Sequence, residues 1–520
     1  MDNIVFGKKM EKKMQEKKQS RNLGIIVSYL VTVLGSIINF LMIPVYLKNC
    51  GFEGYGFFQY IYSIASFATI LDFGVGNVLC RYITEYKESG NEIEKENVVC
   101  YGFFFVVLLA LVVVAVAFFV FPNIELVFGK MMPEKISLAQ TLLILLAAYF
   151  IIALFQHMLD GIMLAYEKYI TIKALVLVRI SLKVFLVFLF FSQGIGVETI
   201  ALSDTVASFV LLVFSLLYIF VFLKIKLRLH SVNMPLLKEI SKLSAAFCIQ
   251  SVVVYANNSI DKYLIGRIAT TVSVAIYTLG MQFYSFFGEI PDIIQRYFIP
   301  EATKLVMRTS NGREYGEFAV KPGRIQFILL GLIYGAFLLF GRHLIILWSG
   351  QESMQAWAIG IVLMTAVIIP FVEGICLTIL IALNKRMFRS LVLTGVAIVN
   401  LIFSIPLIHI FDAFGAALGT FCSLIIGNCI IMNVYYYKVI GIDVVSMLKK
   451  IFSGLLPALV VAVILSSPLA LISKQGVLWL GLQSVIFLVV YSMSLWLLGL
   501  NDYEKNWVIA KINKIRKKVV

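Results

Sequence analysis

The sequence predicts an all-α polytopic membrane protein, and three observations support this fold class. The chain has 520 residues, of which 61% are apolar and only 14% are charged, whereas soluble domains are about 45–50% apolar and about 25% charged. Apolar runs long enough to cross a bilayer, roughly 20 residues, recur along the chain. Basic residues are dense in every second link between these runs, as in membrane proteins that use them for orientation. This composition excludes an ordinary soluble enzyme and a disordered chain.

Fourteen apolar runs have the length of a membrane span. They cover residues 24–47, 55–79, 98–121, 138–160, 172–192, 197–223, 243–266, 271–298, 323–341, 355–381, 390–409, 414–437, 451–472 and 476–499. We expect two six-helix lobes, at 24–223 and 243–437, around a central cavity, with a cytoplasmic linker at 224–242 between them. Two further helices follow within 451–499, and basic tails occupy 1–23 and 500–520.

The distribution of Lys and Arg predicts which side of the membrane each link faces. With the N-terminus placed in the cytoplasm, 33 basic residues fall on the cytoplasmic side and 6 on the outside. This asymmetry predicts that both termini are cytoplasmic. The first apolar run is too long for a signal peptide and has no small-residue cleavage site, so we expect a retained span. The net charge of +15 therefore indicates topology, and we expect no nucleic-acid partner.

Motifs for common enzymatic chemistry are missing from the sequence. It contains no phosphate-binding loop, no dinucleotide fingerprint, no H-E-x-x-H and no G-x-S-x-G. The seven cysteines form no C-x-x-C pair, and we interpret them as small buried hydrophobic residues. We therefore expect a non-enzymatic protein without cofactor or metal.

Two basic residues inside the fifth apolar run are the most informative charges. Arg179 and Lys183 are four residues apart and share one face of a helix. At 1.5 Å per residue, Lys183 lies roughly 16 Å inside the membrane, too deep to reach water easily. Such charges face a wet cavity or a partner. We favour a cavity that receives an anion; the alternative is that each residue pairs with a carboxylate on a neighbouring helix.

Two carboxylates lie deep in their spans without a basic neighbour in sequence. Asp72 is in the second span, and Glu373 follows Pro370 in the tenth. Buried carboxylates carry protons or bind sodium in transporters, and a nearby proline frees backbone carbonyls for an ion. Asp72 and Glu373 are therefore our candidates for ion coupling, although local pairing is the simpler interpretation of any single embedded carboxylate.

Several short motifs resemble one known family. They are Asn39, Ile43-Pro44, Gly51, Gly54-Tyr55-Gly56, Leu71-Asp72-Phe73-Gly74 and Arg81, followed by Asp261-Lys262-Tyr263-Leu264-Ile265-Gly266 and Tyr277. The chain resembles bacterial Wzx-type flippases for O-antigen and capsule repeat units, the polysaccharide transporter branch of a superfamily that includes multidrug exporters and the lipid II flippase. The resemblance implies two lobes and alternating access in the bacterial cytoplasmic membrane. It also implies that an undecaprenyl-pyrophosphate-linked oligosaccharide moves from the cytoplasmic to the outer leaflet.

The embedded basic residues suit such a substrate. Arg binds phosphate oxygens bidentately and Lys supplies a point charge. Arg179 and Lys183 are our first candidates for binding the pyrophosphate, with Lys262 and Arg296 as weaker candidates near the two mouths of the cavity. A gradient of H⁺ or Na⁺, or of the substrate itself, would drive the cycle. Besides membrane lipids, a polysaccharide polymerase and glycosyltransferases are the expected partners.

Two other functions remain open. A cation-coupled exporter of small molecules would have a cavity rich in carboxylates and aromatic residues, and Arg179 and Lys183 disfavour cationic drugs. A membrane-bound glycan polymerase or ligase would need a large external loop with catalytic groups. The longest external links, near 122–137 and 342–354, are about 12–16 residues long, which disfavours this class.

Overall fold

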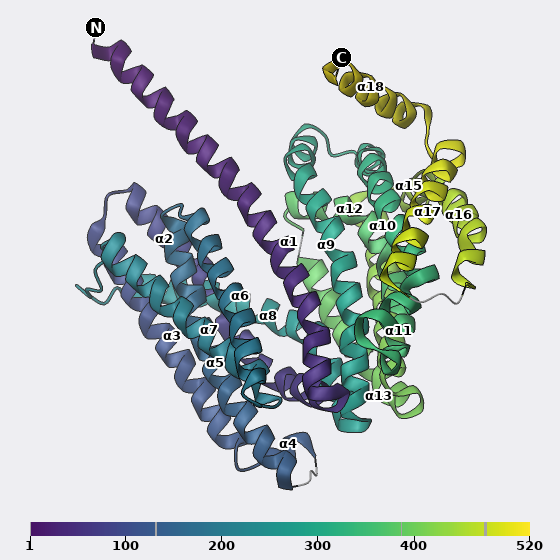
Figure 1. The fold of residues 1–520 in the computed structure, drawn as a ribbon. Helices are drawn as coiled ribbons and strands as arrows, with labels where there is room; N and C mark the ends of the chain where they lie inside the picture. The colour runs from purple at the N-terminus through teal and green to yellow at the C-terminus, as the bar shows by residue number, and fades with distance from the viewer. Residues whose placement is uncertain (1, 130–132, 386, 473–475, 520) are drawn as a thin grey trace. The chain divides into compact units, whose positions relative to one another are not determined.

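The computed structural model describes residues 2–129, 133–385, 387–472 and 476–519, which form helices and short turns without any strand (Figure 1). The predicted all-α class is confirmed. Contacts divide the chain into two compact units, Met1–Ala275 and Ile276–Val520. Each unit is described by itself below. The side chains of residues 1–26, which include the predicted basic N-tail at 1–23, lie outside the described part of the chain.

Eight α-helices lie in the first unit. They are α1 (Asp2–Ala65), α2 (Val75–Glu88), α3 (Glu92–Val120), α4 (Ile124–Phe128), α5 (Pro133–Ala165), α6 (Tyr169–Ser192), α7 (Glu198–Leu217) and α8 (Met234–Ile268). A 3-10 segment, Ser66–Asp72, joins α1 to α2. The helix at 243–266, which we expect to open the second lobe, groups with the first unit. The predicted lobe boundary at 224–242 stays a prediction.

The second unit holds the remaining helices. They are α9 (Thr271–Arg308), whose first turn belongs to the first unit, α10 (Gly312–Ser349), α11 (Gln355–Val372), α12 (Gly374–Ala382), α13 (Met387–Leu424), α14 (Met432–Tyr435), α15 (Val444–Phe452), α16 (Leu455–Ala470), α17 (Val477–Ser494) and α18 (Asp502–Val519). Residues 425–431, 436–440 and 495–499 form π-helical turns between them.

Nine helices in the described residues are long and apolar enough to cross a membrane, and a bent pair, Val444–Phe452 with Leu455–Ala470, makes a tenth. Two of the nine, Leu30–Glu88 and Met387–Ile440, have 59 and 54 residues, enough for two crossings each. Gly51 and Asp412 interrupt them with non-helical backbone. The predicted count of fourteen is compatible with this arrangement.

Asparagine side chains mark the starts of three helices. Asn91, Asn233 and Asn311 each accept a hydrogen bond from a backbone N–H in the first turn of α3, α8 and α10. This satisfies a donor that the helix itself leaves free. All three lie in links that the charge distribution assigns to the cytoplasmic side.

Large apolar side chains lie both inside and outside the helix bundles. On α3, Phe104, Phe118 and Phe119 are exposed, the arrangement expected of a helix whose outer face meets lipid. Inside the first unit, α2 and α5 cross so closely that a Cβ on Gly76 would lie 2.4 Å from the His157 carbonyl oxygen. Gly161 on α5 faces Gly76 in the same way. Close helix approach through small residues is typical of membrane bundles.

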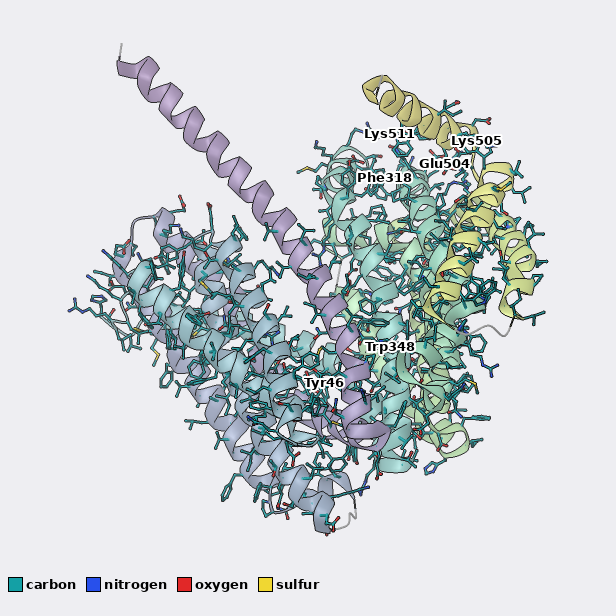
Figure 2. All side chains as sticks on the ribbon, viewed as in Figure 1. Tyr46, Phe318, Trp348, Glu504, Lys505 and Lys511 are labelled. Atoms are coloured by element: carbon teal, nitrogen blue, oxygen red, sulfur yellow. The ribbon has the colours of Figure 1, made fainter. Side chains whose placement is uncertain are left out.

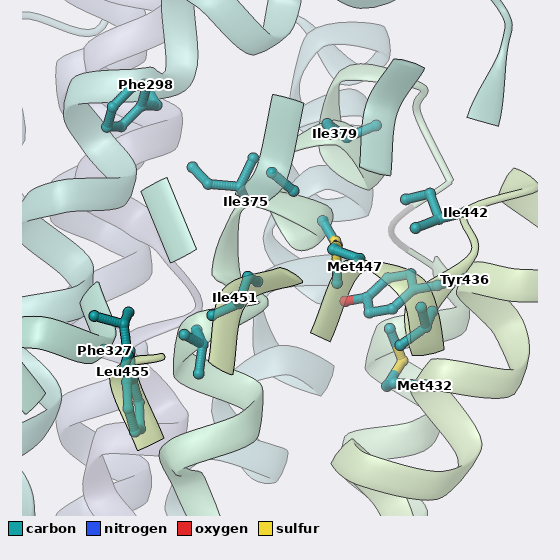
Figure 3. Close-up of a cluster of buried hydrophobic side chains, with 14 of the residues drawn as sticks. Phe298, Phe327, Ile375, Ile379, Met432, Tyr436, Ile442, Met447, Ile451 and Leu455 are labelled. Atoms are coloured by element: carbon teal, nitrogen blue, oxygen red, sulfur yellow. The ribbon is translucent and has the colours of Figure 1, made fainter. Parts of the chain in front are cut away.

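The core of the second unit gathers around α10, α12 and α15. Figure 3 shows Tyr436, Ile442, Met447, Ile451 and Leu455 packed together. Val444, Met447 and Ile451 place one face of α15 in this core, whereas Val445 is 65% exposed. The short helix α15 is therefore amphipathic, and a bend of 41° separates it from α16.

Candidate functional site

Arg179 and Lys183 on α6 share one carboxylate from α7. Lys183 Nζ lies 2.8 Å from Asp204 Oδ2, and Arg179 Nη1 lies 3.7 Å from Asp204 Oδ1. The three side chains are 17–27% exposed. Both basic residues therefore contact a carboxylate on a neighbouring helix, as the alternative interpretation of the sequence predicts. One carboxylate, however, cannot neutralise two cations. The cluster keeps one positive charge, so an anion role for it remains a proposal.

Polar side chains lead from this cluster to Lys262 on α8. The Lys262 ammonium donates to Gln59 Oε1 at 3.4 Å, and Gln59 Nε2 donates to the Tyr55 hydroxyl at 3.1 Å. The rings of Tyr55 and Tyr46 stack with centroids 6.2 Å apart. Tyr46, labelled in Figure 2, lies near Lys183 and Asp204. We call these residues, with Arg179, the cationic cluster of the first unit.

Two groups in the cationic cluster lack a partner of matching chemistry. Among the described residues, no carboxylate forms an ion pair with Lys262, whose contact is the neutral Gln59 amide. The Tyr46 hydroxyl is buried beside the Lys183 ammonium, outside ideal hydrogen-bond geometry in the same set of residues. Buried polar groups are normally satisfied, and each exception calls for an explanation. A bound anion would accept from both.

Arg324 shows how a structural arginine differs from Arg179. Arg324 on α10 is 5% exposed and contacts both carboxylate oxygens of Glu504, at 2.7 and 2.8 Å. It also donates to the carbonyls of Lys450, Ile451, Ser453 and Gly499. Arg179, in contrast, makes one 3.7 Å contact with a carboxylate. Arg179 also interacts with the Tyr149 hydroxyl. A guanidinium carries five N–H donors, so these two contacts use fewer of them than the contacts of Arg324 do.

Asp72 lies at a break between helices and contacts a histidine. After the 3-10 segment, Phe73 and Gly74 both adopt left-handed backbone, with φ of 48° and 61°. Strained backbone of this kind often marks functional sites. His157 Nδ1 on α5 lies 3.5 Å from Asp72 Oδ2, while Asp72 Oδ1 is buried without a hydrogen bond in the described structure. Asp72, at the end of the 3-10 segment, is thus paired with α5 next to the α2–α5 crossing.

A polar cavity adjoins Asp72. It has a volume of about 390 Å³ and contains two carboxylates, an imidazole, an amide and an ammonium. Its lining consists of Asp72, Gly76, Asn77, His157, Asp160, Gly161, Leu164, Tyr169, Ile172 and Lys173. Asp160 accepts from Gln156 Nε2 at 2.8 Å. The cavity therefore surrounds Asp72 with groups that exchange protons or bind a cation.

Glu373 lies in the second unit, between α11 and α12. It is 2% exposed, and Asn433 Nδ2 donates to its Oε1 at 3.0 Å. In the part of the chain that the structure describes, no Lys, Arg or His forms an ion pair with Glu373. Its own N–H donates to the Ile369 carbonyl, beside Pro370. A carboxylate held by an amide at an interrupted helix is able to take up a proton or a small cation.

Arg296 belongs to a different unit from the other three candidates. It lies on α9 in the second unit and is exposed. Among described residues it has no ion-pair partner. Arg179, Lys183 and Lys262 belong to the first unit, so the structure groups three of the four predicted binding residues.

Sequence reasoning missed the partners of these residues. Asp204 is noticeable in the sequence as a carboxylate inside a span, but its pairing joins α6 to α7. Tyr46, Gln59 and His157 carry no motif, and His157 is 85 positions from Asp72. A helical-wheel comparison of neighbouring spans could suggest Asp204; nothing in the sequence indicates Gln59.

Solved structures of membrane transporters share this fold. The "Lipid II flippase MurJ, inward closed conformation" matches with a TM-score of 0.71 and 15% identity, over 91% of this chain and 97% of that one. An inward-facing multidrug resistance MATE family transporter of the MOP superfamily matches with a TM-score of 0.57 and 16% identity, over 80% and 99%. A structure of the MATE multidrug transporter DinF-BH matches at 0.52 and 16%, over 84% and 96%. The fold is that of this transporter class.

A family model assigns the chain more narrowly. The model described as "Polysaccharide biosynthesis protein" matches residues 23–290, more than half of the chain. The protein is therefore a multi-pass membrane protein of the polysaccharide biosynthesis family, as the motifs predict. No curated protein matches the chain.

Proposed function

We propose that this protein is a flippase for lipid-linked oligosaccharides. It moves undecaprenyl-pyrophosphate-linked repeat units from the cytoplasmic to the outer leaflet of the bacterial cytoplasmic membrane by alternating access. The observation that carries the proposal is the cationic cluster in the first unit, where Asp204 faces Arg179 and Lys183 and only an amide faces Lys262. A pyrophosphate is the anionic part of such a substrate, and the family membership of the chain supports the glycan.

Each basic residue has a separate role in this proposal. Arg179 binds two phosphate oxygens through its planar fork, and Lys183 and Lys262 supply point charges. The Tyr46 hydroxyl donates to a further oxygen. Asp204 keeps Lys183 in place and limits the net charge, so that the anion can be released on the opposite side. The lipid tail stays in the bilayer throughout.

Ion coupling would use one of the embedded carboxylates. Glu373 is buried without a cationic partner among the described residues, and Asp72 is paired with His157. Binding of H⁺ or Na⁺ at either position changes the local charge at an interrupted helix. Such a change biases the two access states when the ion binds one of them better.

The direct test is transport in vesicles. Arg179→Ala should lower outward movement of a lipid-linked saccharide at least about 10-fold, because a charge-assisted hydrogen bond contributes about 1.5–3 kcal/mol. Lys262→Ala should lower it similarly, and Arg179→Lys should give an intermediate rate because the charge remains but the fork is lost. Lys48→Ala is the matched control, since Lys48 is an exposed cation on α1. Wild-type transport by Arg179→Ala and Lys262→Ala at normal expression removes the proposed site.

Depletion in cells separates the flippase from the exporter. Loss of a flippase leaves lipid-linked repeat units in the inner leaflet, whereas loss of an exporter raises sensitivity to drugs. The drug-transporter folds make the second outcome the relevant alternative. A defect in joining finished glycan units, with normal flipping, would instead indicate a polymerase or ligase.

A further inference from the structure

A second basic site lies in the second unit, whereas the cationic cluster belongs to the first. It is a cavity of about 700 Å³, within the range of about 300–1,000 Å³ typical of ligand pockets. We call it the α15–α18 pocket. Its lining consists of Val320, Arg324, Ser446, Lys449, Lys450, Ser453, Gly454, Leu498, Gly499, Leu500 and Asn501.

Positive charge in the α15–α18 pocket is not neutralised by the protein. Lys449 and Lys450 are exposed at its wall, and neither makes an ion pair within the described residues. Glu504 lies nearby, but both of its carboxylate oxygens contact Arg324, and one also accepts from the Asn501 N–H. Arg324 and Glu504 neutralise each other, which leaves the two lysine charges for a ligand.

The remaining lining suits a phosphate ester. Ser446, Ser453 and Asn501 supply hydroxyl and amide groups at the wall. Among the residues that line the cavity, none is acidic. Lysines with hydroxyl and amide donors around them bind phosphate through charge-assisted hydrogen bonds.

The surroundings of the pocket place it at the depth of lipid headgroups. On one side, Trp496 and Leu497 expose apolar surface on the turn that ends at Gly499. On the other side α18 begins, and Figure 2 shows Glu504, Lys505 and Lys511 on this charged helix. The amphipathic helix α15 exposes Val445 beside its two lysines. Apolar surface that meets lysines is typical of a membrane interface, and the charge asymmetry predicts that this interface is cytoplasmic.

We propose that the α15–α18 pocket binds the phosphate of an anionic phospholipid from the cytoplasmic leaflet. Lys449 and Lys450 contact the phosphate, the hydroxyl and amide groups contact the headgroup, and the acyl chains lie along Leu498 and the exposed apolar surface. Arg324 is a positioning residue, because its contacts with three carbonyls around the α15–α16 link and with Gly499 shape the wall. This binding does not depend on which substrate the protein transports.

The test measures lipid binding to the purified full-length protein. Native mass spectrometry counts bound phosphatidylglycerol and phosphatidylcholine with identical acyl chains. A Lys449→Gln/Lys450→Gln variant should bind phosphatidylglycerol roughly 25-fold more weakly, since each lysine near an anionic lipid contributes about fivefold. Its phosphatidylcholine binding should not change. Lys438→Gln is the matched control, because Lys438 is an exposed lysine on the preceding turn and outside the pocket.

Three results would overturn the assignment. Equal affinity of the wild type for both lipids would show no headgroup selectivity. An equal loss in Lys438→Gln would reduce the effect to general surface charge. Displacement of the lipid by millimolar inorganic phosphate, with equal losses of phosphate and lipid binding in the double variant, would assign the pocket to free phosphate. A melting curve of the double variant confirms that it is folded.

Discussion

At the scale of single residues, Arg324 and Arg179 differ in how many partners the protein gives them. Arg324 has a carboxylate and four backbone carbonyls around it, whereas Arg179 shares Asp204 with Lys183. A buried charge without a partner is costly, so a chain that keeps one in a membrane span has a reason to do so. Their spacing in the sequence makes Arg179 and Lys183 the first candidates for binding an anion. The structure adds weight to Lys262, because its contact is a neutral amide 203 residues away.

Substitutions of Glu373 and Asp72 test separately which carboxylate binds the coupling ion. Glu373→Gln keeps an oxygen that accepts from Asn433 but removes the charge, so it should abolish stimulation of transport by an imposed H⁺ or Na⁺ gradient. Transport down a substrate gradient should persist. Asp72→Asn removes a carboxylate charge in the first unit. It tests whether Asp72, which contacts His157, couples transport to the ion gradient instead. The measurement is the initial transport rate in vesicles with and without each gradient.

The control for both variants is Glu301→Gln, since Glu301 is an exposed carboxylate on α9. Wild-type stimulation in both Glu373→Gln and Asp72→Asn contradicts a coupling role for these carboxylates. Loss of stimulation in one variant alone assigns the ion to that unit.

At the scale of helices, glycine contacts set how closely α2 and α5 approach. A Cβ at Gly76 would lie 2.4 Å from the His157 carbonyl oxygen, and a backbone atom cannot rotate away. Gly76→Ala should therefore destabilise the protein by about 1–3 kcal/mol, the usual cost of overpacking. It should also alter the Asp72–His157 contact next to the crossing. The measurement is the apparent melting temperature of the purified protein.

Gly481→Ala in α17 is the matched control, because nothing lies within 4 Å of a Cβ at Gly481. Alanine there should leave the melting temperature unchanged or slightly raised, since alanine favours helix more than glycine. A Gly76→Ala protein as stable as the control would show that the two helices separate without cost.

The sequence predicts some helix interruptions and misses others. Gly51 and Asp412 fall in the links expected between spans, because a polar or glycine-containing stretch interrupts the apolar run. The breaks at Phe73-Gly74 and at Glu373 fall inside predicted spans. Hydropathy cannot reveal them, since apolar residues continue on both sides, but Pro370 indicates a kink near Glu373. Contacts between helices, such as those of His157 and Asn433, accompany each break and are set only in the folded chain.

At the scale of the whole molecule, the all-α class and the family follow from hydropathy, charge asymmetry and a few motifs. Motifs and apolar runs are local in the chain, and the charge asymmetry is a sum over all of its links, so none of these signals depends on the folded structure. The make-up of the cationic cluster does not follow, because Gln59, Lys183 and Lys262 come from α1, α6 and α8, which are far apart in sequence. Side-chain direction within a span decides which charges meet, and periodicity alone leaves that direction open in helices that are apolar on every side.

The predicted topology is tested by cysteine labelling. In a background without the seven native cysteines, Asn123→Cys and Gln351→Cys should react with an impermeant maleimide in intact cells. Ser89→Cys and Asn311→Cys should react only after the membrane is permeabilised. These positions lie in links of opposite predicted sides, and Asn311→Cys also removes the cap of α10. The opposite labelling pattern, or labelling of all four in intact cells, contradicts cytoplasmic termini.

The Arg324 contacts have a consequence for the order of assembly. Arg324 is synthesised 180 residues before Glu504, and the carbonyls of Lys450 to Ser453 also emerge well after it. During synthesis, therefore, the guanidinium enters the membrane interface without its final neighbours. Water, lipid phosphate or the insertion machinery has to accommodate it until α15 and α18 arrive. The contacts of Arg324 then form only when α15 and α18 dock onto α10, so a chain that lacks these helices leaves Arg324 without its partners.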